Sequence, residues 1–264
     1  MNLRSFVRLT VLAGWAFAMP MSSLFTVASA DEPEAPPSIS DLRTSGLRAL
    51  ETGDRSGASD AADRLLLHYE ADPRAIRLAG DLYLRSGKIH SSIKQFERFI
   101  ERVPQEKPEL WQFGIALALA ERYEEGRKLF ELHRTVNPND VENAAWHFYC
   151  VAKLAGREQA EKLVLPAPGD TRVPMNEIRR LLIDGNENRV VDAVKQLTEG
   201  TPGHASAKFY ADLYLGLYAD SIGQDEKARQ YVNEAAKTTQ VNYMADIARV
   251  YAMELDADVK AKPE

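Results

Sequence analysis

The sequence predicts an all-α fold, a right-handed α-α superhelix of about eleven or twelve helices. One observation is a helical hairpin at residues 110–138, where apolar residues recur at helical spacing on both sides of a charged break. Another is a repeat with a period of 34 residues, since several landmarks recur at that interval. One hairpin cannot bury its apolar faces alone, so repeated hairpins are expected to stack. The landmarks are the pairs Gly80 and Gly114, Phe96 and Phe130, and Pro104 and Pro138.

The helical domain is expected to span residues 41–256. Its first hairpin has extra residues in the turn, as expected of a capping repeat. Prolines interrupt the period at 166–174, and a shorter pair of helices follows at 175–200. A last helix at about 242–255 is expected to cover the open end of the stack, and 257–264 is a polar tail. The clearest repeats are 73–106, 107–140 and 209–242.

Two positions in the repeat predict how the helices pack. A glycine at position 80 lets the two helices of its hairpin approach closely, because a side chain there would hold them apart. Phe148 stands 34 residues after Gly114, where a small residue is expected. The packing around Phe148 must therefore differ from that of the other repeats.

The first thirty residues have the pattern of a secretory signal peptide. Arg4 and Arg8 precede an uncharged, mostly apolar run, and Ala28-Ser29-Ala30 fits a cleavage site after Ala30. Residues 31–40 contain three prolines and are expected to be a disordered leader. The mature protein is therefore expected in the periplasm or outside the cell, with no stable membrane anchor.

Charge and cysteine content argue against a nucleic-acid partner and against an internal disulfide. The net charge is −6, and no basic cluster replaces phosphate counterions, so nucleic acid is not an expected partner. Cys150 is the single cysteine, which excludes an internal disulfide. It is expected to be an inert core residue, although His147 lies three residues away on the same helix.

Known catalytic and cofactor patterns are missing from the sequence. The five histidines are scattered, and no spacing of histidine or cysteine suggests a metal site. Nucleotide-binding loops and the nucleophile motif of serine hydrolases do not occur. We therefore expect no enzyme activity, no cofactor and no metal.

The first helix of each repeat is expected to line a concave groove. Arginines beside aromatic residues are typical of a peptide-docking surface. An open groove and a groove covered by the C-terminal helix or by a second copy are both consistent with the sequence. The candidate binding residues are Arg74, Arg77, Asp81, Arg85, Trp111, Ile115, Leu119, Tyr149 and Lys153.

A family resemblance rests on several stretches between about residues 75 and 255. They are Asn137-Pro138-Asn139-Asp140, 146–154 with Gln159-Ala160, 178–197, Phe209-Tyr210, 214–218 and 223–228. Together with the period of 34, they make the chain similar to tetratricopeptide repeat (TPR) proteins. The order of regular and irregular units resembles the NlpI family of periplasmic lipoproteins.

The resemblance implies a homodimeric scaffold that holds cell-wall endopeptidases and a PDZ-containing processing protease together. The acylated cysteine that follows the signal peptide in that family is missing here. The leading hypothesis is thus an exported, non-catalytic scaffold that binds a protein or peptide in its groove. A self-associating assembly factor of the envelope is the alternative, and a cell-wall hydrolase is a third hypothesis.

Overall fold

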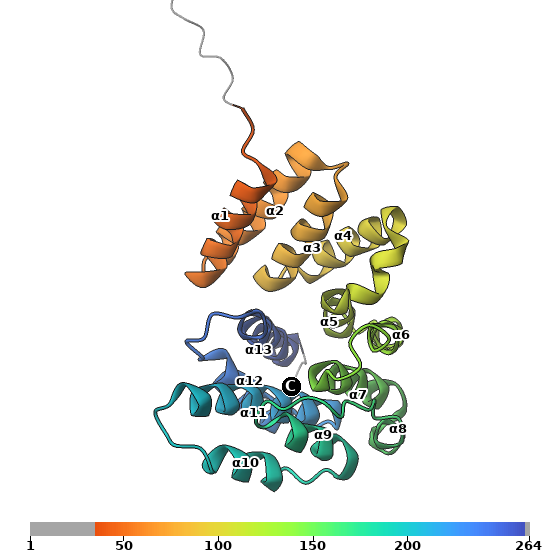
Figure 1. Cartoon of the computed structure of the whole chain (residues 1–264), viewed down its shortest axis with the longest axis vertical. Coiled ribbons are helices and arrows are strands. Elements are labelled where there is room, and N and C mark those ends of the chain that lie inside the picture. The colour runs from red at the N-terminus through yellow and green to blue at the C-terminus, as the bar shows by residue number, and fades with distance from the viewer. Residues whose placement is uncertain (1–34, 262–264) are drawn as a thin grey trace, which may run out of the picture. The chain divides into compact units, whose positions relative to one another are not determined.

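The computed structural model describes residues 35–261, so the predicted signal peptide and the first four residues of the predicted leader, 31–34, lie outside the described part. The last two residues of that leader, Ile39 and Ser40, already belong to the first helix. Residues 35–261 form thirteen α-helices and one 3-10 helix, η1, and contain no strand (Figure 1). Successive helices pack as hairpins that form an α-α superhelix, which confirms the predicted fold class. In chain order the elements are α1 (Ile39–Glu51), α2 (Arg55–Tyr69), α3 (Pro73–Ser86), α4 (Ile89–Arg102), η1 (Pro104–Glu109), α5 (Trp111–Leu119), α6 (Tyr123–His133), α7 (Val141–Ala155), α8 (Arg157–Lys162), α9 (Met175–Asp184), α10 (Asn188–Lys195), α11 (Pro202–Ser221), α12 (Asp225–Ala236) and α13 (Tyr243–Ala261).

Several helices begin at a side-chain cap that the sequence supplies. Ser38 and Asp41 form a capping box at the start of α1, and Asp140 accepts a hydrogen bond from the backbone N–H of Glu142 at the start of α7. Thr201 caps α11 in the same way, immediately before Pro202. These caps pair backbone N–H groups that a helix leaves without an internal acceptor.

The 34-residue landmarks meet in the same way in successive hairpins. A Cβ atom added at Gly80 would lie 3.1 Å from the Phe96 ring, and one added at Gly114 would lie 2.6 Å from the Phe130 ring. Gly216 approaches Val232 of α12 equally closely. In these three hairpins the first helix therefore lacks a side chain where the second helix inserts an apolar one.

Packing differs around Phe148, as the sequence predicted. Its ring stacks on Tyr218 of α11, with 5.7 Å between the ring centroids. The helix that follows, α8, has only six residues. α7 therefore packs against α11, as well as against its own hairpin partner.

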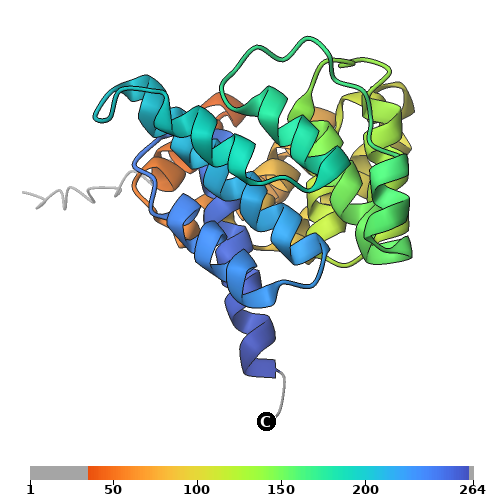
Figure 2. The same ribbon diagram turned by 90° about the horizontal axis from the view of Figure 1, so that it is seen from below.

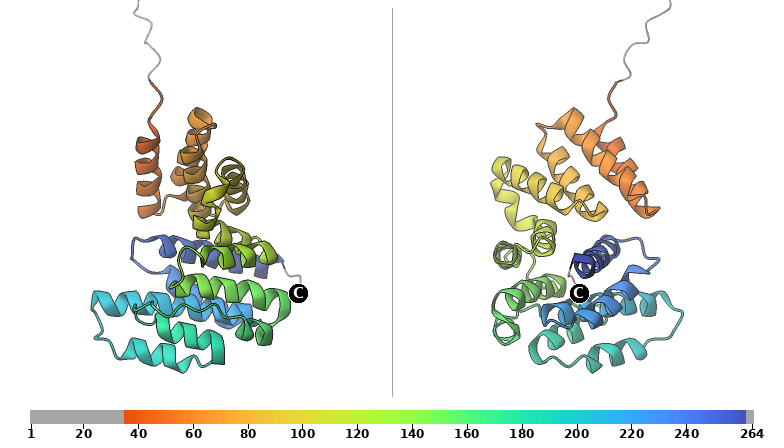
Figure 3. Two further views of the ribbon diagram at one scale, coloured as in Figure 1. Left: turned by 45° about the vertical axis from the view of Figure 1, so that its right-hand side comes forward. Right: turned by 180° about the vertical axis from the view of Figure 1, so that it is seen from behind.

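The last helix, α13, lies beside α3 and α12 (Figures 1 and 3). Its stripe of Met244, Ile247, Val250 and Tyr251 is buried, as expected. Because α13 contacts α3, which belongs to the second hairpin of the chain, it covers the inner side of the superhelix as well as its end. The helix continues to Ala261, past the residue at which the polar tail was expected to begin, and its last turns extend beyond the neighbouring helices (Figure 2).

Candidate functional site

An open groove lies between α1, α3, α4 and η1, next to the start of α13. It encloses about 470 Å³ and contains three arginines above an apolar floor. A pocket of this size, with charged groups around apolar side chains, suits a segment of a partner protein. We call it the basic groove; its lining residues are Ile39, Arg43, Pro73, Arg74, Arg77, Leu78, Asp81, Phe96, Phe99, Val103, Glu106, Gln112 and Tyr243.

The three arginines of the basic groove differ in how firmly they are held. Arg77 is half-exposed, donates to Glu106 of η1 at 2.8 Å, and lies over the ring of Phe99. Arg74 pairs with Asp72 at 2.7 Å, but 82% of its side chain is exposed. Arg43 on α1 is exposed and has no ion pair within residues 35–261. Arg43 and Arg74 are therefore available to an acidic partner, because exposed ion pairs exchange at little cost.

A network of buried charges closes the inner end of the basic groove. Arg85 contacts Asp246 of α13 at 2.8 Å and Asp81 at 3.5 Å, and its guanidinium lies over the ring of Tyr243. Burial raises the pKa of Asp81, although Arg85 and the Tyr243 hydroxyl act in the opposite direction. Burial also works against the charged form of Arg85, but Asp81 and Asp246 outweigh it and raise the pKa of Arg85. This network fastens α13 to α3.

The predicted groove residues of α5 are covered by the rest of the chain. Ile115 is only 1% exposed, and Leu119 is partly buried against the main core. Trp111 is partly buried and meets the ring of Tyr243, the first residue of α13, edge to face at 4.7 Å. The apolar part of the predicted groove is thus covered by α13 and its neighbours.

The two predicted residues of α7 also face inwards. The Tyr149 hydroxyl and the Lys153 ammonium both donate to the buried carboxylate of Asp220 on α11, at 3.0 and 2.7 Å. Tyr251 of α13 donates to the same carboxylate. Asp220 therefore joins α7, α11 and α13 through one side chain.

From the sequence, the predicted groove could be either open or covered. In the structure, one part of it is open and the other part is covered. Arg74, Arg77 and Asp81 line the basic groove, whereas Arg85, Ile115, Tyr149 and Lys153 hold α13 or α11 in place. Sequence reasoning missed the wall from α1, because it treated the first hairpin as a cap. The sequence signal for that wall is an arginine, Arg43, near the start of the first helix of the stack; its lack of an ion pair within residues 35–261 is seen only in the structure.

Comparison with solved structures gives a likeness at the level of the fold alone. A solved tetratricopeptide repeat protein from Parabacteroides merdae resembles the chain. Its TM-score is 0.44 at 11% sequence identity, and the match covers 83% of this chain and 98% of that one. No protein-family model and no curated protein sequence matches the chain. The description of the fold therefore rests on the helix pairs themselves.

Three further features of residues 35–261 concern metal binding, membrane spanning and thiol chemistry. Within 35–261, no cluster of histidine, cysteine and carboxylate side chains has the arrangement of a metal site. No helix in that range combines the length and apolar composition needed to cross a bilayer. Cys150 is fully buried, and burial raises the pKa of its thiol, so its reactive thiolate form is disfavoured.

Proposed function

We propose that the chain is an exported, non-catalytic scaffold that holds a segment of a partner protein in the basic groove. The observation that supports this most is the open groove itself, where the exposed Arg43 and the exposed Arg74, which within residues 35–261 pairs only with Asp72, lie beside an apolar floor at Leu78 and Phe99. A segment with an acidic residue next to an apolar side chain fits both features. The partner class that the NlpI resemblance implies is an envelope peptidase.

Site-specific photo-cross-linking in cells tests this proposal. A photoreactive residue at Leu78, inside the groove, is expected to give a discrete adduct with one partner, while the same residue at Leu67, 75% exposed on α2, gives none. Charge reversal by Arg43→Glu and Arg74→Glu is expected to abolish the adduct. Adducts of equal yield from both positions, or an adduct that survives charge reversal, would refute the groove assignment.

A charge-swap control separates binding from folding. Arg77→Glu removes the ion pair with Glu106, and Arg77→Glu combined with Glu106→Arg restores the pair in the opposite sense. The double variant is expected to regain stability without regaining full partner binding. Partner binding that simply follows stability would show that Arg77 is structural only.

Self-association is the second proposal, because several large apolar residues are exposed at the ends of α7, α8 and α9. They are Leu154 at 46%, Leu163 at 43% and Ile183 at 45% exposure. Apolar surface of this kind is often covered by a second copy. Light scattering across a concentration series decides this question, since a constant monomer mass at high concentration would rule self-association out.

A further inference from the structure

A second cleft lies at the N-terminal end of α7, outside the basic groove. Its inner chamber of about 80 Å³ is mostly apolar, and its outer part encloses about 450 Å³. The two parts share Trp111, Asp140 and Glu142 in their walls. The other inner residues are Ile115, Phe130, Asn143, Trp146 and Met244, and the other outer ones are Asn137, Asn139, Gly169, Asp170, Thr171 and Arg172.

The inner chamber is lined by two residues with buried polar atoms that lack a partner. Asn143 is 4% exposed and its amide nitrogen donates to the carbonyl of Phe130 at 3.0 Å. The Phe130 carbonyl can only accept, so the amide nitrogen of Asn143 must face it and not the amide oxygen. The Asn143 Oδ1 atom is therefore left as an acceptor without a donor in the described part of the chain. Trp146 is 1% exposed, and its indole N–H has no acceptor among residues 35–261. Since the two residues are three apart on α7, they share one helix face.

A neutral amide group carries the complement of both atoms. Its carbonyl accepts from the Trp146 indole N–H, and its N–H donates to the Asn143 Oδ1 atom. A methyl group attached to it would meet the apolar walls at Ile115 and Met244. An ammonium group can only donate, so it would be repelled by the indole N–H of Trp146. A carboxylate can only accept, so it would be repelled by the Asn143 Oδ1 atom. The inner chamber thus favours an acetamido group over a charged one.

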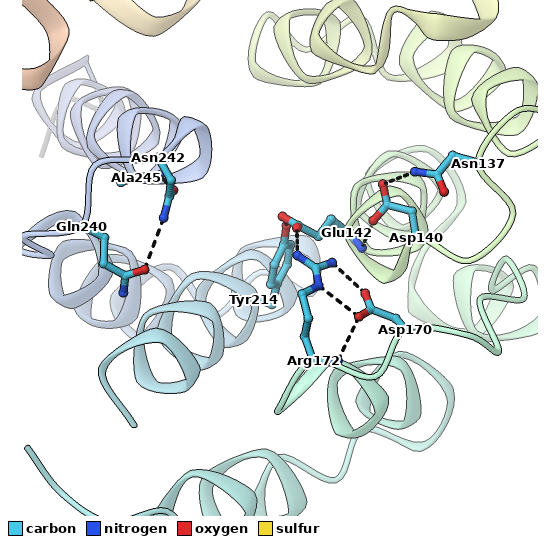
Figure 4. Close-up of polar contacts among 9 residues, drawn as sticks. All are labelled: Asn137, Asp140, Glu142, Asp170, Arg172, Tyr214, Gln240, Asn242 and Ala245. Carbon is cyan, nitrogen blue, oxygen red and sulfur yellow. Dashed lines mark hydrogen bonds and ion pairs between the residues drawn. The ribbon is translucent and has the colours of Figure 1, made fainter. Parts of the chain in front are cut away.

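The outer part presents carboxylates that their neighbours hold in place (Figure 4). Arg172 donates to Glu142 at 2.6 Å and to Asp170 at 2.7 Å, and the Tyr214 hydroxyl donates to the other oxygen of Glu142 at 2.6 Å. Asp140 caps α7 and receives only a long 3.4 Å bond from Asn137 on its second oxygen. These oxygens retain lone pairs for further donors.

The combination of these groups fits a sugar ring. Fixed carboxylates and amides bind hydroxyl groups, which donate and accept, and a partly exposed indole such as Trp111 offers an apolar surface to the C–H face of the ring. Arg172 offsets part of the negative charge, so the cleft does not require a cationic ligand. We propose that this cleft binds a neutral sugar that carries an acetamido group. The acetamido group enters the inner chamber, and the ring hydroxyls meet Asp140 and the outer carboxylates.

The tryptophan content gives a direct test. The chain has three tryptophans, Trp15, Trp111 and Trp146. In the full chain with Trp15→Phe, both remaining indoles line the cleft, so their NMR indole N–H signals and fluorescence report on it. We expect N-acetylglucosamine to shift the Trp146 indole N–H signal with a saturable dependence. Glucose is expected to bind about tenfold more weakly or worse, because it lacks the amide that pairs with both buried atoms.

Two variants and one competing ligand keep the proposal falsifiable. Trp146→Phe removes the N–H and is expected to weaken N-acetylglucosamine binding about tenfold, while Asp140→Asn keeps the helix cap and changes binding only a few-fold. Thermal unfolding of each variant shows that it is folded. No saturable shift with N-acetylglucosamine, equal binding of glucose, or tighter binding of 1,5-diaminopentane that Asp140→Asn abolishes would overturn the proposal.

Discussion

Single glycines fix how closely the paired helices approach. The added Cβ at Gly114 would lie 2.6 Å from the Phe130 ring, closer than carbon atoms pack, whereas at Gly80 the nearest ring atom is 3.1 Å away. Both glycines sit inside helices, where alanine is otherwise favoured over glycine by about 1 kcal/mol. The steric overlap of an added Cβ atom opposes the gain in helix propensity. The distance from that Cβ atom to the facing ring decides which effect is larger.

We therefore expect Gly114→Ala to destabilise the protein by about 1–3 kcal/mol, because the ring of Phe130 must move out of a packed core. Gly80→Ala is the matched control and should cost clearly less, since its steric overlap is smaller and the gain in helix propensity offsets part of it. Urea unfolding of both variants measures the difference. A larger loss at Gly80 than at Gly114 would contradict this account of the packing.

His147 gives the protein a predictable response to acid. Its side chain is almost fully buried, and its Nε2 atom lies 3.3 Å from Glu131. Burial lowers the pKa of His147 below its ordinary value of 6.5, and Glu131 offsets this only in part. Below pH 6.5 the unfolded chain binds a proton that the folded chain does not, so the free energy of unfolding falls as the pH drops towards the lowered pKa.

The expected result is a shallower pH dependence in His147→Gln than in the parent chain over that window. The contribution removed is at most about 1.4 kcal/mol per pH unit, the value for one proton. Unfolding free energies measured at intervals from pH 7.5 to pH 5 give both slopes. Parallel slopes would mean that the pKa of His147 is the same in the folded and the unfolded chain.

At the scale of elements, α13 is the helix that decides what the superhelix exposes. It contacts α3 and α12, and its polar bonds reach Arg85 and Asp220. Its own residues Ile247, Val250 and Tyr251 are buried. The helix therefore closes the inner side of the stack, as well as ending it.

Shortening one buried side chain of α13 measures how strongly it is held. Ile247→Ala is expected to cost about 2–5 kcal/mol, the range for large-to-small substitutions in a packed core. Leu67→Ala, at a side chain 75% exposed on α2, should change stability by less than about 0.5 kcal/mol. Chemical unfolding of the pair tests this, and near-equal losses would show that α13 is not docked as described.

The sequence predicted the helices and their repeat because these depend on residues close together in the chain. The spacing of 34 marked Gly80 and Gly114 as equivalent positions, and likewise Phe96 and Phe130, and the stripe on the last helix marked it as buried. That each glycine meets the phenylalanine of its own hairpin is seen only in the structure. What covers that stripe depends on contacts between distant residues, such as Arg85 and Asp246, which stand 161 residues apart. Local periodicity carries no information about such a pair, so the sequence could not decide whether Ile115 is covered.

At the scale of the whole described chain, the basic groove is what remains accessible of the predicted surface. Its arginines come from α1 and α3, while the apolar positions of α5 and α7 are buried. The binding surface that we propose is therefore smaller and more basic than the sequence predicted. The cleft at the start of α7 adds a second, chemically different opening.

Thiol labelling tests this division most directly. In a background of Cys150→Ala, the chain would carry one new cysteine at a time, through Arg77→Cys in the basic groove, Ile115→Cys under the cover, or Leu67→Cys as an exposed control. Alkylation of the native protein with a maleimide dye, which is too large for the inner chamber of about 80 Å³ that Ile115 lines, is expected to proceed at similar rates at positions 77 and 67. At position 115 it should be at least about a hundredfold slower, because it requires local unfolding. Labelling at position 115 as fast as at position 77 would contradict the account, since the apolar half of the groove would then be open.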